Sequence, residues 1–442
     1  MDRSVERARD YSRRQVLQAG AAGLGSWTLL SACGGGVAGS KSSKGASGAA
    51  GRTIKVGYVS PQTGALAPFG EADTFVVNSI KQKLGAGLKV GSGTSKIEIV
   101  VKDSQSNSQR AGAVASDLIL NDQVDLMLVA STPETVNPVA DQCEANGVPC
   151  ISSVAPWQAW FYGRGAKPGS SYTWTYHFFW GLEDIQAVYE DMWSQVTTNR
   201  KVAALWPNDS DGQAFAAATT GFPGSITKAG YTLLDPGRYE NGTQDYSAQI
   251  AKYKAGNCEI FTGIPIPPDF TTFWQQAAQQ GYRPKLATVA KALLFPSSVE
   301  ALGPLGNGLA TEVWWSPTHP FTSSLTGQTA KALADDYTRT TGKQWTQPIG
   351  FVHSLFEVAA AAITKSGAAG DRKALVGALK DLSINTVCGP LAWGKGPVPN
   401  VAKTPLVGGQ WRKGTGNKYD LVIVSNRDHP EIPSGGKVQA QA

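Results

Sequence analysis

The sequence predicts an α/β protein with two lobes, each a parallel sheet wound on both faces by helices. From residue 53 onward, short β-branched runs alternate with longer segments of helical period. This alternation is typical of parallel sheets covered by helices. It runs through two successive blocks of similar length, which indicates two doubly wound lobes. Glycine and proline, at 50 and 25 of the 442 residues, punctuate nearly every junction.

The first block predicts four strands separated by three helices. A β-branched run opens at Ile54, and Pro133 stands at a helix start behind two hydroxyl residues. The expected strands are 54–60, 97–101, 124–130 and 148–152, and the expected helices are 70–84, 107–121 and 133–145.

The second block repeats this order, and the chain then changes character. Strands are expected at 202–206, 231–234, 259–263 and 286–290, with helices at 212–229, 245–255 and 269–280. After an apolar segment at 310–316, we expect helices at 328–341, 350–365 and 371–382, then strands at 389–393, 406–411 and 419–424. This last part is a poor start for a third domain and is expected to complete the two lobes.

Composition excludes several classes of protein. The net charge of +6 is spread thinly, without a Lys/Arg cluster, so no nucleic-acid partner is expected. No apolar run reaches the ~18 residues of a membrane span, which argues against a polytopic membrane protein. The four His are scattered and the five Cys form no CxxC pair, so no metal site is expected.

The first 52 residues have the pattern of an export signal and a tether. Arg13 and Arg14 precede an apolar stretch at 16–30, which ends in Leu-Ser-Ala-Cys at 30–33. The paired arginines resemble a twin-arginine signal, and the second motif resembles a bacterial lipobox with Cys33 as the lipidated residue. We therefore expect a signal at 1–32, and a lipid-bearing Cys33 with a flexible Gly/Ser-rich tether at 33–52, which would attach the protein to a membrane surface. The alternative is a short helix with a chance cysteine.

Cys143 and Cys150 are candidates for a disulfide. They flank a predicted helix end that turns into a strand, and an exported protein meets conditions in which disulfides persist. The bridge and two free thiols are both open at this point. Cys258 and Cys388 are expected to be buried thiols.

The order of motifs from residue 53 to 425 is similar to that of a known family. The motifs are IKVGY at 54–58, GALAPFGE at 64–71, QSN at 105–107, GVPCIS at 147–152, DSDGQ at 209–213 and GTQDYSAQI at 242–250. In these motifs the chain resembles the extracellular solute-binding proteins of branched-chain amino acid ABC transporters, which have the type I periplasmic binding fold.

The resemblance implies two lobes with a ligand cleft between them, joined by three crossover segments and closing by hinge bending. Lobe 1 would comprise 53–177 and 314–389, lobe 2 would comprise 178–313 and 390–430, and residues 431–442 would form a polar tail. The crossovers are expected near 176–179, 310–317 and 388–391. The partners implied are a small carboxylate-bearing ligand and the permease subunits of the transporter.

Hydroxyl residues follow two of the predicted strands of lobe 1. Ligands of parallel sheets lie beyond the carboxyl ends of the strands, where helix N-termini present free N–H groups. Ser131 and Thr132 follow the third strand, and Ser152 and Ser153 follow the fourth. The family uses these two turns to hold a ligand carboxylate, so the resemblance assigns the four residues this role. The alternative is that the hydroxyls only cap helices.

Aromatic residues gather in three clusters, at 156–162, 172–180 and 314–315. Aromatic walls stack on flat or apolar ligands, whereas ordinary core packing is the alternative for many of these rings. Phe69 occupies the position where the family commonly places an aromatic over the ligand. Phe69, Trp157 and Phe178 are the preferred wall candidates.

One site residue departs from the family pattern. Amino-acid binders usually place an acidic residue in the second lobe to receive the ligand's ammonium, but the strand at 286–290 is followed by Lys291. Asp211 is a possible substitute for that acid, unless it only caps a helix. Lys291 would favour an acidic ligand such as an aromatic or aliphatic carboxylate, or it is a solvated surface residue.

A binding role is expected in place of catalysis. The sequence has no GxSxG nucleophile elbow, no metal-binding His pattern and no phosphate-binding glycine loop, so no cofactor is expected. The alternatives are a ligand-sensing receptor with the same fold and an exported hydrolase with an unrecognised Ser/Asp site.

Overall fold

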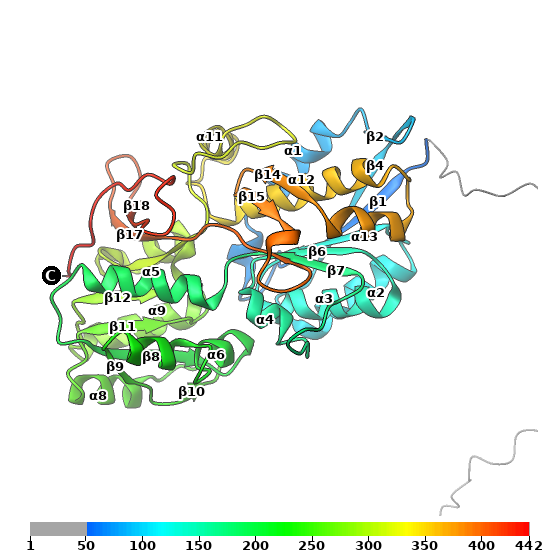
Figure 1. Cartoon of the computed structure of the whole chain (residues 1–442). Helices are drawn as coiled ribbons and strands as arrows, with labels where there is room; N and C mark the ends of the chain where they lie inside the picture. Colours follow the sequence, from blue (N-terminus) through cyan, green and yellow to red (C-terminus); the bar gives the residue numbers. More distant parts are fainter. Residues whose placement is uncertain (1–50, 442) are drawn as a thin grey trace, which may run out of the picture. The chain divides into compact units, whose positions relative to one another are not determined.

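Two β-sheets organise residues 51–441, the part of the chain that the computed structural model describes (Figure 1). The predicted signal, the Cys33 lipidation site and nearly all of the tether lie outside these residues. Within them, no helix is both long and apolar enough to cross a membrane.

The first sheet is entirely parallel, in the order β16-β7-β6-β5-β1-β4. Its strands are β1 (Ile54–Ser60), β4 (Ile97–Asp103), β5 (Leu126–Ala130), β6 (Cys150–Ser153), β7 (Thr175–Phe178) and β16 (Val401–Ala402). Because β1 pairs with both β4 and β5, the strand order reverses there, and such a switch point opens a crevice at the carboxyl ends of the strands. A hairpin of β2 (Leu88–Val90) and β3 (Gly93–Ser95) follows the first helix.

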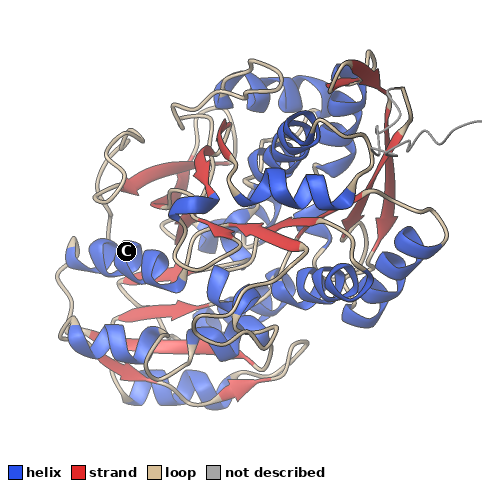
Figure 2. Cartoon of the chain, turned by 45° about the vertical axis from the view of Figure 1, so that its right-hand side comes forward, coloured by secondary structure: helices blue, strands red, loops and turns tan. Residues whose placement is uncertain are grey.

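Helices cover both faces of the first sheet (Figures 1 and 2). One face carries α2 (Ser108–Leu120), α3 (Pro133–Asn146) and α4 (Trp157–Phe161). The other carries α1 (Asp73–Lys83), α12 (Pro348–Ser366) and α13 (Arg372–Lys380), with α11 (Ala330–Thr341) against α12. Each strand contributes side chains to the hydrophobic core on both faces of the sheet, because alternate side chains point in opposite directions. Tyr58 packs toward α12 and Val59 packs toward α2.

The second sheet is parallel except at one edge. Its order is β10-β8-β11-β12-β13-β17-β18, with β9 on β8, and β17 and β18 run antiparallel. The strands are β8 (Lys201–Pro207), β9 (Thr232–Leu234), β10 (Arg238–Tyr239), β11 (Ile260–Gly263), β12 (Leu286–Val289), β13 (Ala310–Val313), β17 (Val407–Lys413) and β18 (Tyr419–Ser425).

The helices of the second lobe include two that were not predicted. They are α5 (Leu182–Ser194), α6 (Ser210–Phe215), α7 (Phe222–Lys228), α8 (Ser247–Ala255), α9 (Pro267–Gln279) and α10 (Pro296–Ala301). Short 3-10 turns occur at Ala67–Gly70, Ala292–Leu294, Gly303–Gly306 and Trp393–Lys395. The unpredicted helices are α5 and α10. The expected helix at 212–229 is two helices, because Gly221 and Pro223 start α7 anew.

The third crossover lies later in the chain than predicted. The segment at 389–392 forms β15 (Gly389–Ala392), which pairs with β14 (Ser383–Thr386) in a hairpin. The chain then adds β16 to the first sheet and reaches β17 of the second sheet only after residues 403–406. Lobe 1 therefore extends to about residue 402, and the expected crossover at 388–391 is wrong.

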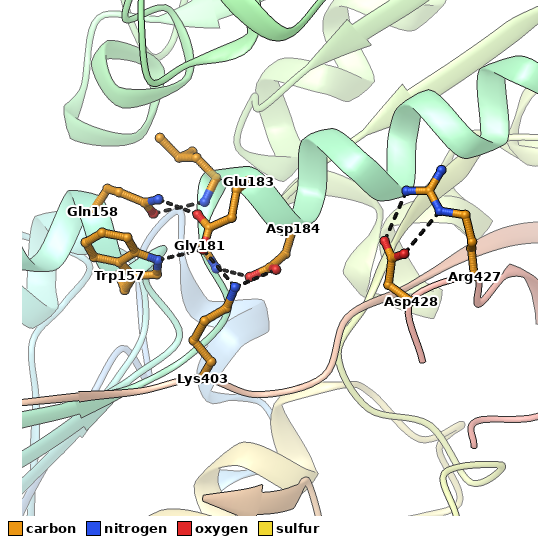
Figure 3. Close-up of polar contacts among 9 residues, drawn as sticks. Trp157, Gln158, Gly181, Glu183, Asp184, Lys403, Arg427 and Asp428 are labelled. Carbon is orange, nitrogen blue, oxygen red and sulfur yellow. Dashed lines mark hydrogen bonds and ion pairs between the residues drawn. The ribbon is translucent and has the colours of Figure 1, made fainter. Parts of the chain in front are cut away.

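The crossovers are tied to each other by ion pairs (Figure 3). Lys403, in the third crossover, contacts Glu183 at 2.7 Å and Asp184 at 2.6 Å, at the start of α5. The indole N–H of Trp157, from α4 of lobe 1, donates to Glu183 at 3.1 Å. These contacts connect both lobes and two crossovers at one point.

The C-terminal segment is packed on lobe 2 and is not a free tail. Ile432 is fully buried, and the N–H of Gln439 donates to the Gln410 side chain at 3.1 Å. The N–H of Val438 likewise donates to Gln195 at 3.0 Å. The prediction of a polar tail is therefore wrong, because the buried side chain of Gln410 in β17 and the side chain of Gln195 at the C-terminal end of α5 bind the backbone of this segment.

Cys143 and Cys150 are both free, buried thiols, as are Cys258 and Cys388. Of the two alternatives left open by the sequence, the structure has the free thiols and not the disulfide. Burial is the largest cause that raises the pKa of the Cys143 thiol, and the neighbouring Cys150 raises it further. Protonated, enclosed thiols of this kind pack as small apolar side chains.

Candidate functional site

A small cavity lies between the lobes, at the carboxyl ends of the parallel strands. Its volume is about 30 Å³, room for about one water molecule. Most of the residues that line it are apolar or aromatic, and the full set is Phe69, Thr132, Val154, Pro156, Phe179, Trp180, Asp211, Ile264, Lys291, Leu294, Glu312 and Trp314. The cavity therefore receives residues from lobe 1, lobe 2 and two crossovers.

Two hydroxyl groups at the start of α3 have no hydrogen-bond partner. Thr132 is the N-cap residue of α3, yet its side chain does not cap the helix. The oxygens of Ser131 and Thr132 are buried without a partner among the described residues. Buried polar groups are normally hydrogen-bonded, so these two hydroxyls, at the start of a helix, are candidates to bind a ligand's oxygen atoms. The alternative that they only cap the helix is not what the structure shows.

Two buried indole N–H groups near this helix start also have no hydrogen-bond partner among the described residues. Trp180 lies two residues beyond β7, and Trp314 directly follows β13. Both line the cavity, both are buried, and neither indole nitrogen has a partner in the described chain. Phe179 stands between the two rings, with centroid distances of 4.7 Å to Trp180 and 5.1 Å to Trp314. These indoles were not among the predicted site residues, although Trp314 obeys the strand-end rule used for Ser131.

Lys291 enters the cavity from the end of β12 and meets carboxylates. Its Nζ lies 2.6 Å from Asp211 in the first turn of α6, 3.7 Å from Asp209 at the N-cap of α6, and 3.9 Å from Glu134 of α3. Asp209 also caps α6 by accepting from the N–H of Gly212 at 2.8 Å, whereas Asp211 does not cap. Lys291 is only 4% exposed, so it is not a solvated surface residue.

The protonation states of this cluster follow from burial and mutual attraction. Burial by itself lowers the pKa of Lys291, but the surrounding carboxylates together raise it above its ordinary value. Burial raises the pKa of Asp211 to about 7, against the pull of Lys291. The lysine therefore remains a cation, and its charge is directed at protein carboxylates.

Glu312 is the remaining carboxylate at the cavity. Its oxygens accept from the hydroxyl groups of Tyr189 and Thr311, each at 2.8 Å, and from the N–H of Lys291 at 3.3 Å. Burial raises the pKa of Glu312 to about 7, while these hydrogen bonds oppose the shift.

Five predicted site residues do not line the cavity. One is Ser131, whose neighbour Thr132 does line it. The hydroxyl of Ser152 donates to the carbonyl of Tyr176 at 3.2 Å, and that of Ser153 donates to the carbonyl of Phe178 at 2.6 Å, so both fasten β6 to β7. The ring of Phe178 stacks on Phe351 of α12, with centroids 6.0 Å apart, in the lobe 1 core. Trp157 packs with the α4 residues, and its indole N–H is bonded to Glu183. The structure does place Phe69, Thr132, Asp211 and Lys291 at the cavity.

Elsewhere in the described residues, three serine hydroxyl oxygens each lie 2.9 Å from a histidine ring nitrogen. The pairs are Ser152–His177, Ser316–His319 and Ser323–His353. Burial lowers the pKa of His177 and His319 to about 3 and that of His353 to about 4. None of the six residues lines the cavity between the lobes. Enclosed imidazoles held neutral in this way act as structural hydrogen-bonding groups.

A larger hollow of about 170 Å³ lies on the outer side of lobe 2. Its polar aromatic residues are already engaged: the Trp274 indole donates to the carbonyl of Leu305 at 3.1 Å, and the Tyr282 hydroxyl donates to that of Cys258 at 3.1 Å. The interlobe cavity is therefore the better candidate site, despite its smaller size.

Comparison with protein families agrees with this architecture. Residues 53–415 match the model of a periplasmic binding protein family. The chain belongs to this family, which assigns it a solute-binding role and implies that it is exported. No curated protein sequence matches the chain.

Solved structures show the same fold at low sequence identity. The leucine-binding protein of Thermotoga maritima is 18% identical, with a TM-score of 0.71 over 85% of this chain and 99% of that one. A solute-binding protein of an ABC transporter from Rhodopseudomonas palustris, in complex with 3,4-dihydroxybenzoic acid, is 19% identical, with a TM-score of 0.68 over 84% and 96%. A type 1 periplasmic binding protein from Bordetella pertussis is 17% identical, with a TM-score of 0.69 over 84% and 100%. The expected fold class, two α/β lobes of the type I periplasmic binding kind, is confirmed.

Proposed function

We propose that the protein captures a small carboxylate-bearing solute between its lobes and delivers it to the permease of an ABC importer. The observation that carries the proposal is a set of buried donors without partners. The Thr132 hydroxyl and the indoles of Trp180 and Trp314 belong to residues that line the interlobe cavity, and the Ser131 hydroxyl belongs to the residue next to Thr132. A carboxylate offers two oxygens with several acceptor positions, and would satisfy these donors without a charged partner.

The size of the cavity requires that the lobes move. A volume of about 30 Å³ does not admit an amino acid or an aromatic acid, so a solute enters only when the lobes separate about the crossovers. Closure would then bring Phe69 of lobe 1 and Lys291 of lobe 2 to opposite sides of the solute. Binding and hinge motion are therefore coupled in this proposal.

The ligand class is proposed as an amino acid or an aromatic or aliphatic acid. Structures with this fold include a protein named for binding leucine and another in complex with 3,4-dihydroxybenzoic acid. Both ligands carry a carboxylate on an apolar or aromatic body, which suits a cavity lined by aromatic rings and unpartnered donors.

The N-terminal motifs support export and anchoring by lipid. The paired arginines at 13–14 and the Leu-Ser-Ala-Cys motif at 30–33 would direct export, followed by lipidation of Cys33 and attachment to the outer face of the membrane. Replacement of Cys33 by Ala in the full chain is expected to move the protein from the membrane fraction to the soluble fraction. Unchanged membrane association of Cys33→Ala would contradict the lipid anchor.

A thermal-shift screen tests the proposed function. The panel contains amino acids, aromatic acids and short aliphatic acids, each with its amide or alcohol as a matched neutral control. We expect one carboxylate class to raise the unfolding temperature and its neutral control not to, since binding to the native state stabilises by mass action. No stabilisation by any carboxylate, together with turnover of an ester or amide panel, would refute solute binding in favour of hydrolysis.

A further inference from the structure

Lys291 is held in a strained backbone conformation. Its φ and ψ angles are 63° and −58°, and the N–H of Ala292 donates to the carbonyl of Ala290 at 2.6 Å. This is a γ-turn with positive φ, which is rare for a residue with a side chain. Such conformations cost of order 1–3 kcal/mol in other proteins and cluster at ligand sites. The backbone at the end of β12 is thus shaped to place this one ammonium group between the lobes.

The ammonium group is enclosed by carboxylates of both lobes. Asp211 and Asp209 approach it from lobe 2 at 2.6 and 3.7 Å, and Glu134 approaches from lobe 1 at 3.9 Å. The other oxygen of Glu134 accepts from the N–H of Ser210 at 3.0 Å, also across the cleft. The carboxylates on this side of the cavity are therefore already neutralised, at least in part, by a cation of the protein.

We propose that Lys291 is a specificity-determining residue that stands in place of a solute's own ammonium group. The cavity would then select acids without an α-amino group over the corresponding amino acids. This inference rests on the proposed function and deepens it. The solute carboxylate would bind the donors of Ser131, Thr132 and the two indoles, and its apolar body would contact Phe69 and Phe179.

An α-amino acid meets two obstacles in this arrangement. Its ammonium group would lie beside Asp211 or Glu134 and so within a few ångströms of Lys291, where like charges repel strongly because little water screens them. If it displaced Lys291 instead, a buried cation would lose its partners, which is strongly unfavourable. An acid without the amino group meets neither obstacle.

Matched ligand pairs test the inference on the wild-type protein. The pairs are 4-methylpentanoate with leucine and 3-phenylpropanoate with phenylalanine, measured by isothermal titration calorimetry. In each pair that binds, the acid without the amino group is expected to bind at least tenfold more tightly. Equal or tighter binding of the amino acid would overturn this inference alone. If neither these ligands nor any other carboxylate of the panel binds, the proposed function is overturned and this inference with it.

A variant tests whether Lys291 is the cause. Lys291→Met frees Asp211 and Glu134 for a solute's ammonium. The ratio of affinities that favours the acid without the amino group over the amino acid is therefore expected to fall at least tenfold in each pair. Lys291→Arg keeps the cation and should keep the preference. The control is Lys343→Met, which removes a cation paired with Glu71 at 2.7 Å outside the cavity. A preference unchanged in folded Lys291→Met would overturn the role of this side chain, and if that variant does not fold, the wild-type pairs still decide.

Discussion

The ammonium group of Lys403 lies 2.6 Å from the carboxylate of Asp184. Lys403 belongs to the third crossover, and Asp184 lies in the first turn of α5, just after the first crossover. The same lysine contacts Glu183, which in turn accepts from Trp157 of lobe 1 (Figure 3). One cation therefore holds two adjacent acidic side chains at the point where the lobes are joined.

Replacement of Lys403 by Met should destabilise the protein, because Glu183 and Asp184 then repel each other without a cation between them. Partly exposed ion pairs contribute up to about 1 kcal/mol each, and about 1 kcal/mol corresponds to a fall of ~2–4 °C in unfolding temperature for a lobe-sized domain. Thermal unfolding at low and high salt measures the effect, which should shrink as salt screens the charges. Lys331→Met is the matched control, since Lys331 pairs with Asp335 at 2.6 Å on an exposed helix face. Equal unfolding temperatures for the two variants at low salt would contradict a stabilising role of Lys403.

The hydroxyls of Ser131 and Thr132 should affect binding but not stability. Ser131→Ala and Thr132→Val remove buried oxygens that have no partner in the described chain, so the free energy of unfolding should be unchanged or slightly higher. The same changes should weaken carboxylate binding by about 10- to 100-fold each, as expected for a lost hydrogen bond to a charged group of ~1.5–3 kcal/mol. Calorimetric binding and denaturant unfolding are measured on the same samples.

Ser153→Ala is expected to have the opposite effect. Its hydroxyl is bonded to the Phe178 carbonyl at 2.6 Å, so its loss should lower the free energy of unfolding by about 1 kcal/mol and leave binding unchanged. If Ser153→Ala weakened binding as much as Ser131→Ala does, our placement of the site would be wrong.

Much of the fold could be predicted because each element carries a local pattern. The strand at 54–60 is found with its predicted bounds, and the helix start at Pro133 is as expected. Helix α5, which was not predicted, directly follows the aromatic cluster at 172–180, whose rings were interpreted as residues of the cleft. The third crossover was misplaced because β16 has only two residues and joins its sheet through long-range pairing with β7.

The candidate site was predictable mainly where a strand ends. Thr132, Asp211 and Lys291 follow strands directly or through a short turn, whereas Phe69 was predicted from the family resemblance, and the structure places all four at the cavity. The direction of a side chain within or beside a strand depends on which strands pair with each other and in which register, and a single sequence does not reveal this pairing. Ser153 and Phe178 face their own lobe for this reason, whereas Trp180 and Trp314 face the cavity.

Glu312 should make stability depend on pH in a particular direction. The pKa of Glu312 is raised by burial from 4.5 to about 7, so between these values the folded state holds a proton that the unfolded state has released. Stability from this group is therefore lost as pH rises through that window, by about 1.4 kcal/mol per pH unit.

The difference between wild type and Glu312→Gln isolates this contribution. Denaturant unfolding is measured at pH 5 and pH 8. The free energy of unfolding of the variant should rise relative to that of the wild type as pH rises, because the neutral amide cannot ionise. Glu98→Gln, at an exposed position of β4, serves as the control and should follow the wild type. A constant difference between wild type and Glu312→Gln across this range would contradict the raised pKa.

Gly350, near the start of α12, should not accept a methyl group although it lies in a helix. A Cβ atom at this position would lie 2.4 Å from the ring of Trp315, which is fully buried and packed edge-on against Trp345 with centroids 6.0 Å apart. Gly350→Ala is therefore expected to destabilise by about 1–3 kcal/mol through overpacking.

Gly377 in α13 gives the opposite expectation from the same substitution. A Cβ there meets no atom within 4 Å, so Gly377→Ala should gain up to about 1 kcal/mol from helix propensity alone. Denaturant unfolding of the two variants beside the wild type measures the expected loss of stability in Gly350→Ala and the expected gain in Gly377→Ala. Because Trp315 lies just beyond β13, in the second crossover, stabilisation by Gly350→Ala would mean that this ring is free to move and that the crossover is less tightly packed than the structure shows.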